Sequence, residues 1–258
     1  MGGAIIEAVC REAAPQDVFI YDRDAKKAAE LSAKTGCHVM ASAEEAAGSA
    51  HFVFMCVKPN VLSDALRALC PVLKETDKVV VSIAAGVAKS SIKSVLAAEG
   101  VTLPVIRLMP NTPVAVGKGM ILVSPDRELP EEDLALLLKA LAQGGLTSVI
   151  DEGYIDAATP VFSCSPAYVY MFIEALADGG VMAGVPRDKA QSYAAQAVLG
   201  AAAMVLESGK HPGELKDAVC SPGGSTIVGV EELEKSGFRG AVASAVYEAY
   251  KKTVNLGK

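Results

Sequence analysis

The alternation of apolar and polar positions divides the chain into two halves with different patterns. In the first half, short apolar runs alternate with stretches rich in Ala, Lys and Glu, which are typical of buried strands and of helices respectively. The predicted strands are 18–21, 52–57, 78–83, 105–109, 120–123 and 148–150, and the predicted helices are 1–9, 25–34, 59–73, 90–98 and 130–142. Repeated strand–helix units predict an α/β fold with a doubly wound parallel sheet.

The pattern changes near Asp151, and no strand is predicted after Tyr154. Long helical stretches over 166–183, 186–208 and 238–255 are separated by segments that contain Gly and Pro. We therefore expect a first domain of residues 1–152, followed by an all-helical domain of residues 153–258.

The first two helices of the second half are apolar over much of their surface. Such helices must be buried, and a domain of about a hundred residues has too little interior to bury several of them. They therefore predict an interface between subunits, and hence a homodimer at least. A closely packed monomeric bundle is the alternative.

Composition excludes several classes of protein. With 51% hydrophobic and 21% charged residues, the chain is not expected to be disordered. The net charge of −6, without a long basic run, disfavours nucleic acid and anionic membranes as partners. The longest apolar stretch, 194–206, is too short to span a bilayer, and no secretory leader is recognised.

Six cysteines without a C-x-x-C pair and only three histidines disfavour a metal site or a disulfide framework. We expect a cytoplasmic protein with reduced thiols.

Two features near the start of the chain are typical of dinucleotide binding. The opening helical pattern carries Met1 and Gly2, and Asp22 ends the next predicted strand. In a dinucleotide fold, the last glycine of a G-x-G-x-x-G turn begins a helix, and an acidic residue about 20 positions on binds the ribose 2′-hydroxyl. The neighbouring Arg23 is able to stack on adenine or to pair with a 2′-phosphate, so NAD and NADP both stay open. The alternative is a frayed terminus followed by an Asp helix cap and a solvated Arg.

Small or polar residues follow three of the predicted strands. These motifs are Cys56-Val57-Lys58-Pro59, Ile83-Ala84-Ala85-Gly86 and Met109-Pro110-Asn111-Thr112-Pro113. Ligands of open α/β sheets bind outside the carboxyl ends of the strands, and small residues let a ring or phosphate approach the backbone. Each motif alone is also compatible with ordinary turn chemistry. Three of them on successive strands predict a cofactor cleft contacted by residues 56–59, 83–85 and Asn111.

A further candidate site in the second half is Ser221-Pro222-Gly223-Gly224-Ser225-Thr226, which precedes a helical stretch over 227–235. A Gly-Gly turn that leads into a helix leaves backbone N–H groups free at the positive end of the helix dipole. Such a turn is suited to a carboxylate or phosphate, to which Ser225 and Thr226 add hydroxyl donors. An ordinary N-cap is the alternative.

Several motifs together resemble the pyrroline-5-carboxylate reductase family. The motifs are V-K-P at 57–59, A-A-G at 84–86, R-L-M-P-N-T-P at 107–113, S-P-A-Y-V at 165–169, F-I-E-A-L-A-D-G at 172–179, H-P-G-E-L-K-D at 211–217 and S-P-G-G-S-T-I-V-G-V-E-E-L-E-K-S-G-F-R at 221–239. The last motif is the most specific, and the resemblance covers nearly all of the chain.

This resemblance implies a Rossmann-type domain joined to a helical dimerisation domain, with dimers often assembled into larger rings. It implies reduction of 1-pyrroline-5-carboxylate to L-proline with NADPH, or with NADH as the alternative. Residues 56–59 and 83–85 then contact the dinucleotide. Residues 223–226 bind the substrate carboxylate, from the partner subunit, and Thr226 is the candidate catalytic residue.

Two positions depart from the family pattern. The family begins with a strand and the turn G-x-G-x-M-G, whereas this sequence begins at that Met. Either the start is misassigned or truncated, or the chain binds cofactor poorly, and a version extended upstream by one strand is expected to bind NAD(P) more tightly. The family also favours S-G-S-G-P-A-Y, where this chain has Ser163-Cys164-Ser165-Pro166-Ala167-Tyr168 after Phe162, with a different loop geometry expected.

Two other functions are compatible with parts of this pattern. A reductase of the β-hydroxyacid dehydrogenase type would need a catalytic Lys in the first long helix of the second domain, and residues 172–183 contain none. A catalytically silent dinucleotide-binding or scaffold protein is the second alternative. Reduction of a protonated cyclic imine requires no strong general acid, so the expected site has backbone amides, Thr226 and Asn111 in place of a His or Lys pair.

Overall fold

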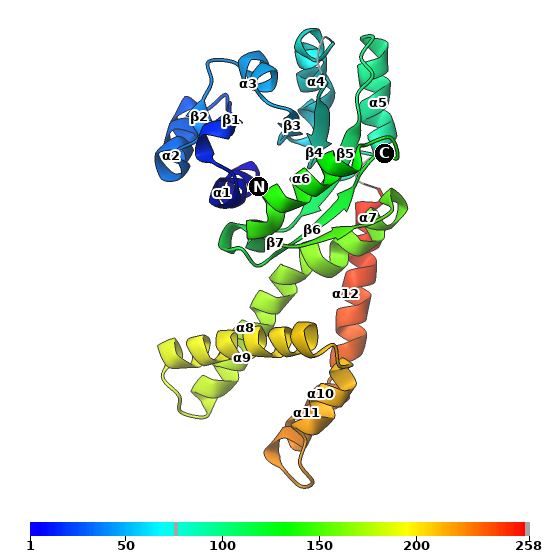
Figure 1. Ribbon diagram of the computed structural model, residues 1–258. Helices are drawn as coiled ribbons and strands as arrows, with labels where there is room; N and C mark the ends of the chain where they lie inside the picture. Colours follow the sequence, from blue (N-terminus) through cyan, green and yellow to red (C-terminus); the bar gives the residue numbers. More distant parts are fainter. Residues whose placement is uncertain (75–76, 256–258) are drawn as a thin grey trace. The chain divides into compact units, whose positions relative to one another are not determined.

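The computed structural model of this chain describes residues 1–74 and 77–255. Its internal contacts divide the chain into two compact units (Figure 1). The first unit is Met1–Ser163 with the chain from Tyr250 on, and the second is Cys164–Ala249. The sequence predicts that the helical domain begins at residue 153; by internal contacts, α7 (Glu152–Thr159), which packs against a strand of the first unit, is grouped with that unit.

A five-stranded sheet forms the centre of the first unit. Its strands lie in the order β3 (Phe52–Met55), β4 (Val79–Ser82), β5 (Val105–Pro110), β6 (Gly119–Ser124) and β7 (Gly145–Val149). β3, β4 and β5 are parallel to one another, as expected for a Rossmann-like sheet. The sequence did not predict that β6 runs antiparallel to β5. The reason is the connection, which contains only the short η2 (Thr112–Val116), whereas a parallel crossover needs a dozen or more residues.

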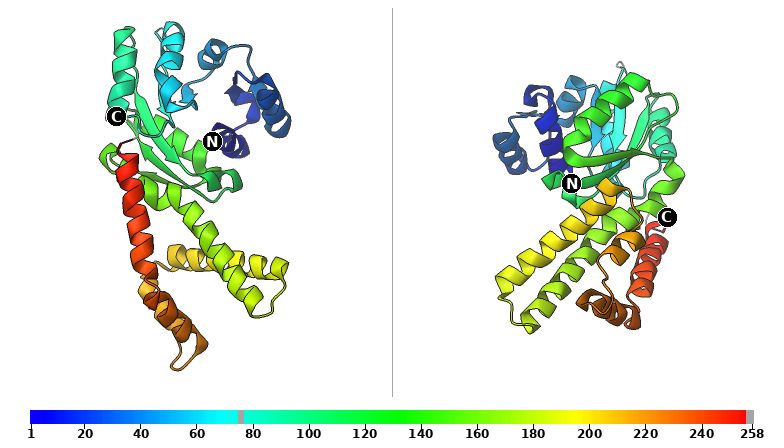
Figure 2. Two further views of the ribbon diagram at one scale, coloured as in Figure 1. Left: turned by 180° about the vertical axis from the view of Figure 1, so that it is seen from behind. Right: turned by 60° about the horizontal axis from the view of Figure 1, so that its bottom comes forward.

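A separate parallel pair of strands lies apart from β3 (Figures 1 and 2). It consists of β1 (Phe19–Ile20) and β2 (His38–Val39), with Phe19 opposite His38. β2 was not predicted, because it has two residues, both exposed, and therefore no apolar run.

Helix α1 (Gly2–Glu12) packs against both sheets. Its buried Ile5 and Ala8 join the apolar core over β4, β5 and β6, whereas Ile6 and Cys10 pack on the smaller cluster around Ile20. This arrangement fixes the start of α1 within the first unit.

The sequence predicted helices at 25–34, 59–73, 90–98 and 130–142, and these together with further, unpredicted helices connect the strands and cover the main sheet. They are η1 (Pro15–Asp17), α2 (Ala25–Thr35), α3 (Ala43–Ser49), α4 (Pro59–Leu73), α5 (Lys89–Ala98), α6 (Glu131–Leu141), η3 (Ala142–Gly144), α7 and the π-helical turn η4 (Pro160–Cys164). Local signals set several ends: Asp24 caps α2 by accepting from the Lys27 N–H, and Gly36 ends the same helix in the left-handed conformation.

The second unit contains helices and no strand among the residues that the structure describes. These helices are α8 (Ser165–Met182), α9 (Arg187–Ser208), α10 (Pro212–Ala218), α11 (Ser225–Lys235) and the part of α12 (Phe238–Thr253) before Tyr250. Small side chains let α8 and α9 approach closely, because a Cβ at Gly180 would lie 3.3 Å from that of Ala190. Within the described ranges, no helix is long and apolar enough to cross a membrane.

Candidate active site

Two of the predicted cofactor motifs lie at one edge of the main sheet. The last residues of β3 and β4, Met55 and Ser82, are opposite each other in the sheet, so residues 56–59 and 83–85 leave the sheet side by side. The pairing extends one residue further, where the Ile83 N–H donates to the Met55 carbonyl at 3.4 Å. Ala84 is buried and Ala85 is exposed, and small side chains at this point leave the backbone accessible.

Lys58 and Pro59 are where the sequence places them, at the beginning of α4. Lys58 is the N-cap and Pro59 the first helical residue, a position that proline favours. The Lys58 side chain makes no capping hydrogen bond and the residue is exposed. Val57 before it packs against the apolar core under α4. This end of β3 therefore presents the Lys58 ammonium at the edge of the sheet, without an ion-pair partner among the described residues.

The start of α1 lies against the same edge. A Cβ built at Gly2 would lie 2.9 Å from the Cβ of Cys56, a separation that real side chains do not tolerate. Only glycine therefore allows the helix to begin this close to the end of β3. Met1 is the N-cap, and no side chain caps the helix. The first backbone N–H groups of α1 are thus free to bind an anion beside Cys56.

The thiol of Cys56 is held in its neutral form. Desolvation by the surrounding protein raises the pKa of Cys56 to about 11, although the residue keeps exposed surface. An uncharged thiol does not repel an anion at the start of α1. Cys56 is therefore suited to packing beside a bound phosphate and unsuited to nucleophilic chemistry.

Asp22 and Arg23 lie beyond the carboxyl end of β1, and both are exposed. The Asp22 carboxylate accepts from the Asp24 N–H at 2.9 Å, and Asp24 in turn caps α2. The helix-capping role that was the alternative for Asp22 thus falls to Asp24. One Asp22 oxygen therefore accepts a hydrogen bond from the backbone, and the side chain of the neighbouring Arg23 lies at the surface.

Asn111 is placed differently from the other cofactor candidates. Its side chain is 7% exposed and uses both ends in contacts with the main chain. The Nδ2 group donates to the Phe162 carbonyl at 2.8 Å, and Oδ1 accepts from the Met120 N–H at 2.9 Å. A contact between Asn111 and cofactor would therefore have to come from its backbone. The sequence predicted a contact between Asn111 and the cofactor and did not foresee these partners.

Sequence reasoning also missed a buried charged cluster around Arg107. The guanidinium contacts Glu152 and Asp156 on α7, and the residue is 3% exposed. A lone Arg inside an otherwise apolar strand was the available signal, since a buried charge requires a partner.

The predicted anion turn in the second unit forms immediately before α11. The Gly224 N–H donates to the Ser221 carbonyl at 3.0 Å, with Pro222 and Gly223 at the two central positions. Gly223 has a φ of +70°, which favours glycine and matches a type II turn. Gly224 is the N-cap of α11, so Ser225 and Thr226 lie in its first turn.

The donors of this turn are exposed and without a capping side chain. No side chain caps α11, and both Ser225 and Thr226 are exposed. Two backbone N–H groups and two hydroxyls of one helical turn are thus available to an anion. A carboxylate fits this donor set as well as a phosphate does.

The segment 162–168, where the chain departs from the family motif, is helical. Phe162 and Ser163 belong to η4, which leads directly into α8 at Ser165. The loop expected here is therefore absent, and a π-helical turn takes its place.

Comparisons with known proteins agree with this arrangement. A family model described as pyrroline-5-carboxylate reductase dimerisation matches residues 152–256, and one described as NADP oxidoreductase coenzyme F420-dependent matches residues 1–86. The chain is 42% identical to pyrroline-5-carboxylate reductase of Escherichia coli (strain K12), over 100% of this chain and 95% of the relative. It is 37% identical to the pyrroline-5-carboxylate reductase of a Synechocystis strain, over 100% of this chain and 96% of the relative.

Solved structures give the same result for the fold. A crystal structure of Plasmodium falciparum pyrroline carboxylate reductase with NADP bound matches with a TM-score of 0.86 and 30% identity, covering 100% of this chain and 95% of that one. A pyrroline-5-carboxylate reductase from Coxiella burnetii matches with a TM-score of 0.90 and 26% identity, covering 100% and 94%. The fold is thus a Rossmann-like domain followed by a mostly helical dimerisation domain. On its full-length similarity to these relatives, the chain belongs to the pyrroline-5-carboxylate reductase family.

Proposed function

We propose that this protein reduces 1-pyrroline-5-carboxylate to L-proline with NADPH, the last step of proline biosynthesis. The observation that carries the proposal is the 42% identity to the Escherichia coli reductase over the whole of this chain. The cofactor assignment is supported by the NADP that is bound in the Plasmodium falciparum structure. NADH is the alternative reductant.

The residues at the edge of the main sheet fit a dinucleotide. No side chain caps the start of α1 at Met1 and Gly2, and a Cβ at Gly2 would fill the space beside Cys56. We assign the pyrophosphate to this helix start, with Lys58 as a nearby cation. Residues 56–59 and 83–85 pack along the cofactor, and Asp22 and Arg23 bind its adenosine ribose or 2′-phosphate. When bound, the reduced nicotinamide supplies the hydride.

The turn before α11 fits the carboxylate of the substrate. The backbone N–H groups of Ser225 and Thr226 bind one carboxylate oxygen each, and Ser225 adds a hydroxyl. Thr226 places its hydroxyl near the ring nitrogen, where it accepts a hydrogen bond from the protonated imine. The substrate arrives with that proton, so the hydride completes the reaction at carbon and the nitrogen becomes the amine of proline. The protein therefore orients two reactants and needs no strong general acid.

Two alternative functions make different predictions. A dehydrogenase that acts on β-hydroxyacids would need a catalytic Lys in α8, and Ser165–Met182 has none. A scaffold protein would bind the dinucleotide without turnover. Assembly into a homodimer or a ring of dimers, and a cytoplasmic location, remain predictions from the sequence.

Steady-state oxidation of NADPH, followed by absorbance, separates these alternatives. We expect oxidation that depends on pyrroline-5-carboxylate and yields proline in equal amount. A β-hydroxyacid with NADP should give no reaction. Binding of NADPH without turnover of the imine would support the scaffold alternative and contradict the proposal.

A further inference from the structure

Three residues on one face of β5 and at its end contact the segment from α7 to η4. Arg107, Met109 and Asn111 occupy alternate positions along the strand and its end, so their side chains share one face of the sheet. All three contact residues between Glu152 and Phe162. The R-L-M-P-N sequence therefore has a common structural role.

Arg107 binds the beginning of α7. Its Nη2 donates to Asp156 Oδ1 at 2.7 Å, and its Nη1 lies 3.5 Å from Glu152 Oε1. The same Glu152 oxygen accepts from the Lys89 N–H, the first of α5, at 2.7 Å. One carboxylate thus links the start of α5, the middle of β5 and the start of α7.

Met109 and Asn111 bind the end of the same segment. Met109 packs in an apolar cluster with Ile155 and Phe162. Asn111 donates to the Phe162 carbonyl, which belongs to the π-helical turn η4. π-helical turns are rare and are frequently found at functional sites. The carbonyl of this one is held by a buried amide from a neighbouring strand.

Stability alone does not account for a buried Arg at this position. Buried ion pairs lose so much hydration that apolar side chains of similar volume often replace them without loss of stability. In addition, no group among the described residues accepts from the Arg107 Nε. The guanidinium makes directional polar contacts with two residues of α7, Glu152 and Asp156. An apolar side chain would make none.

We propose that Arg107 and Asn111 are positioning residues, which hold α7 and η4 against β5 so that the reactants meet in a productive orientation. The inference rests on the proposed function. The chain passes from η4 directly into α8, so these contacts hold the backbone of the first unit immediately before that helix begins. A displacement of about 1 Å far from the chemistry is able to lower a rate by two orders of magnitude.

The test uses Asn111→Leu, Arg107→Lys and Asp156→Asn in the full-length protein. Asp156→Asn changes the partly exposed partner of Arg107, so it tests the contact even if the substitution of Arg107 or Asn111 prevents folding. Two control variants remove buried hydrogen bonds that do not join β5 to this segment. Lys78→Met removes donation to Gly48 and Ala50, and Thr159→Val removes a bond within α7.

For each variant we would measure the melting temperature, the NADPH dissociation constant by fluorescence, and kcat and KM for pyrroline-5-carboxylate. We expect kcat to fall about 10- to 100-fold in the three test variants with the NADPH affinity unchanged. The controls should lower the melting temperature and leave kcat near the wild-type value.

Three results would overturn the inference. One is an unchanged kcat in a folded test variant, and another is an equal loss of kcat in the controls. The third is a large loss of NADPH affinity in Asn111→Leu, which would return Asn111 to the cofactor site. Failure of the proposed function is distinct, because the wild-type protein itself would then not reduce pyrroline-5-carboxylate.

Discussion

Thr226 is the side chain on which the proposed reaction depends most directly. Its hydroxyl lies in the first turn of α11, where Gly224 is the N-cap and no side chain caps the helix. Thr226→Ala keeps the backbone donors and removes only that hydroxyl. If the hydroxyl binds substrate in the transition state, kcat/KM should fall about 10- to 100-fold, or about 1.4–2.8 kcal/mol, in steady-state assays.

The control for this change is Thr226→Ser, which keeps a hydroxyl and should retain most of the activity. The NADPH dissociation constant should stay unchanged in both variants, because the dinucleotide is assigned to the first unit. If Thr226→Ala instead lost about 1 kcal/mol of stability with unchanged kcat/KM, the hydroxyl would have a structural role only.

Cys56 provides a second test at the level of one residue. Burial raises the pKa of its thiol to about 11, and only the thiolate reacts with alkylating agents. Iodoacetamide should therefore label Cys56 slowly at neutral pH and faster as the pH approaches that value, as measured by mass spectrometry of the Cys56 peptide. Bound NADP should slow the labelling at high pH. Rapid labelling at neutral pH would contradict the raised pKa.

At the scale of elements, the start of α1 requires glycine at position 2 but not at the neighbouring position 3. Alanine at Gly2 would press on the Cys56 Cβ, whereas a Cβ at Gly3 meets only a Leu31 methyl group at 4.0 Å. Gly2→Ala should move the first turn away from β3 and weaken NADPH binding about tenfold, the equivalent of one charge-assisted hydrogen bond. Fluorescence titration with NADPH would measure the change.

Gly3→Ala is the matched control for this element. It should keep the NADPH affinity and stabilise the protein by up to about 1 kcal/mol, because alanine favours a helix more than glycine does. Cys56→Gly in the Gly2→Ala protein should restore affinity by removing the opposing Cβ. Equal NADPH affinity in Gly2→Ala and wild type would show that the phosphate lies elsewhere.

The elements that the sequence predicted are those with long apolar signals. β3 and β4 have continuous apolar runs, and the run of β5 is interrupted by Arg107; the runs are apolar because both faces of the sheet are covered. The two-residue β2 has no such run. The antiparallel direction of β6 was not predictable, because the apolar pattern of a strand is the same whichever way the strand runs. The π-helical turn at 160–164 was also missed, because its sequence resembles a loop motif of Ser and Pro.

The site was predictable to the extent that it depends on local sequence. The turn before α11 follows from Pro222 and Gly223, whose backbone preferences specify it. Phe162 lies 51 residues from Asn111 and Asp156 lies 49 residues from Arg107, so no local pattern identifies these partners. The cofactor contact of Asn111 thus stays a prediction, to which the fold adds Phe162 and Met120 as partners of its side chain.

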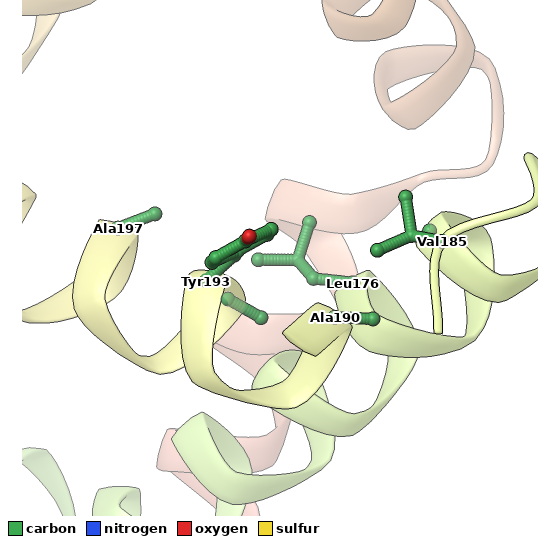
Figure 3. A pocket seen from close by; sticks show the side chains of 7 residues that line it. Leu176, Val185, Ala190, Tyr193 and Ala197 are labelled. Carbon is green, nitrogen blue, oxygen red and sulfur yellow. The ribbon is translucent and has the colours of Figure 1, made fainter. Parts of the chain in front are cut away.

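At the scale of the whole molecule, the second unit exposes large apolar side chains on most of its helices. On α8 and α9 alone, Val169, Tyr170, Met171, Leu176, Met182, Tyr193, Leu199, Met204 and Leu206 are exposed. A shallow apolar groove of about 240 Å³ between these two helices is lined by Leu176, Val185 and Tyr193 together with small residues (Figure 3). Patches of this kind mark interaction sites in proteins that fold properly.

The family model for dimerisation covers this same region, so a second copy of the chain is the expected partner. Leu199 and Leu206 are seven residues apart on α9 and therefore share one face, with 53% and 74% of each residue exposed. If they are buried in the dimer, each contributes about 1.5–3 kcal/mol per subunit. Sedimentation of the wild-type protein at micromolar concentration should show a dimer or a larger assembly.

The double variant Leu199→Glu/Leu206→Glu should weaken association on the order of 100-fold or more, since every 1.4 kcal/mol is a factor of ten. Its activity should fall with the loss of the dimer and recover in part at high protein concentration, because mass action restores the assembly. The matched control is Leu136→Glu on α6, where a leucine of the first unit is 54% exposed. That variant should sediment as the wild type does. A stable, active wild-type monomer would instead mean that these apolar faces serve another partner, and the site would then have to be complete within one chain.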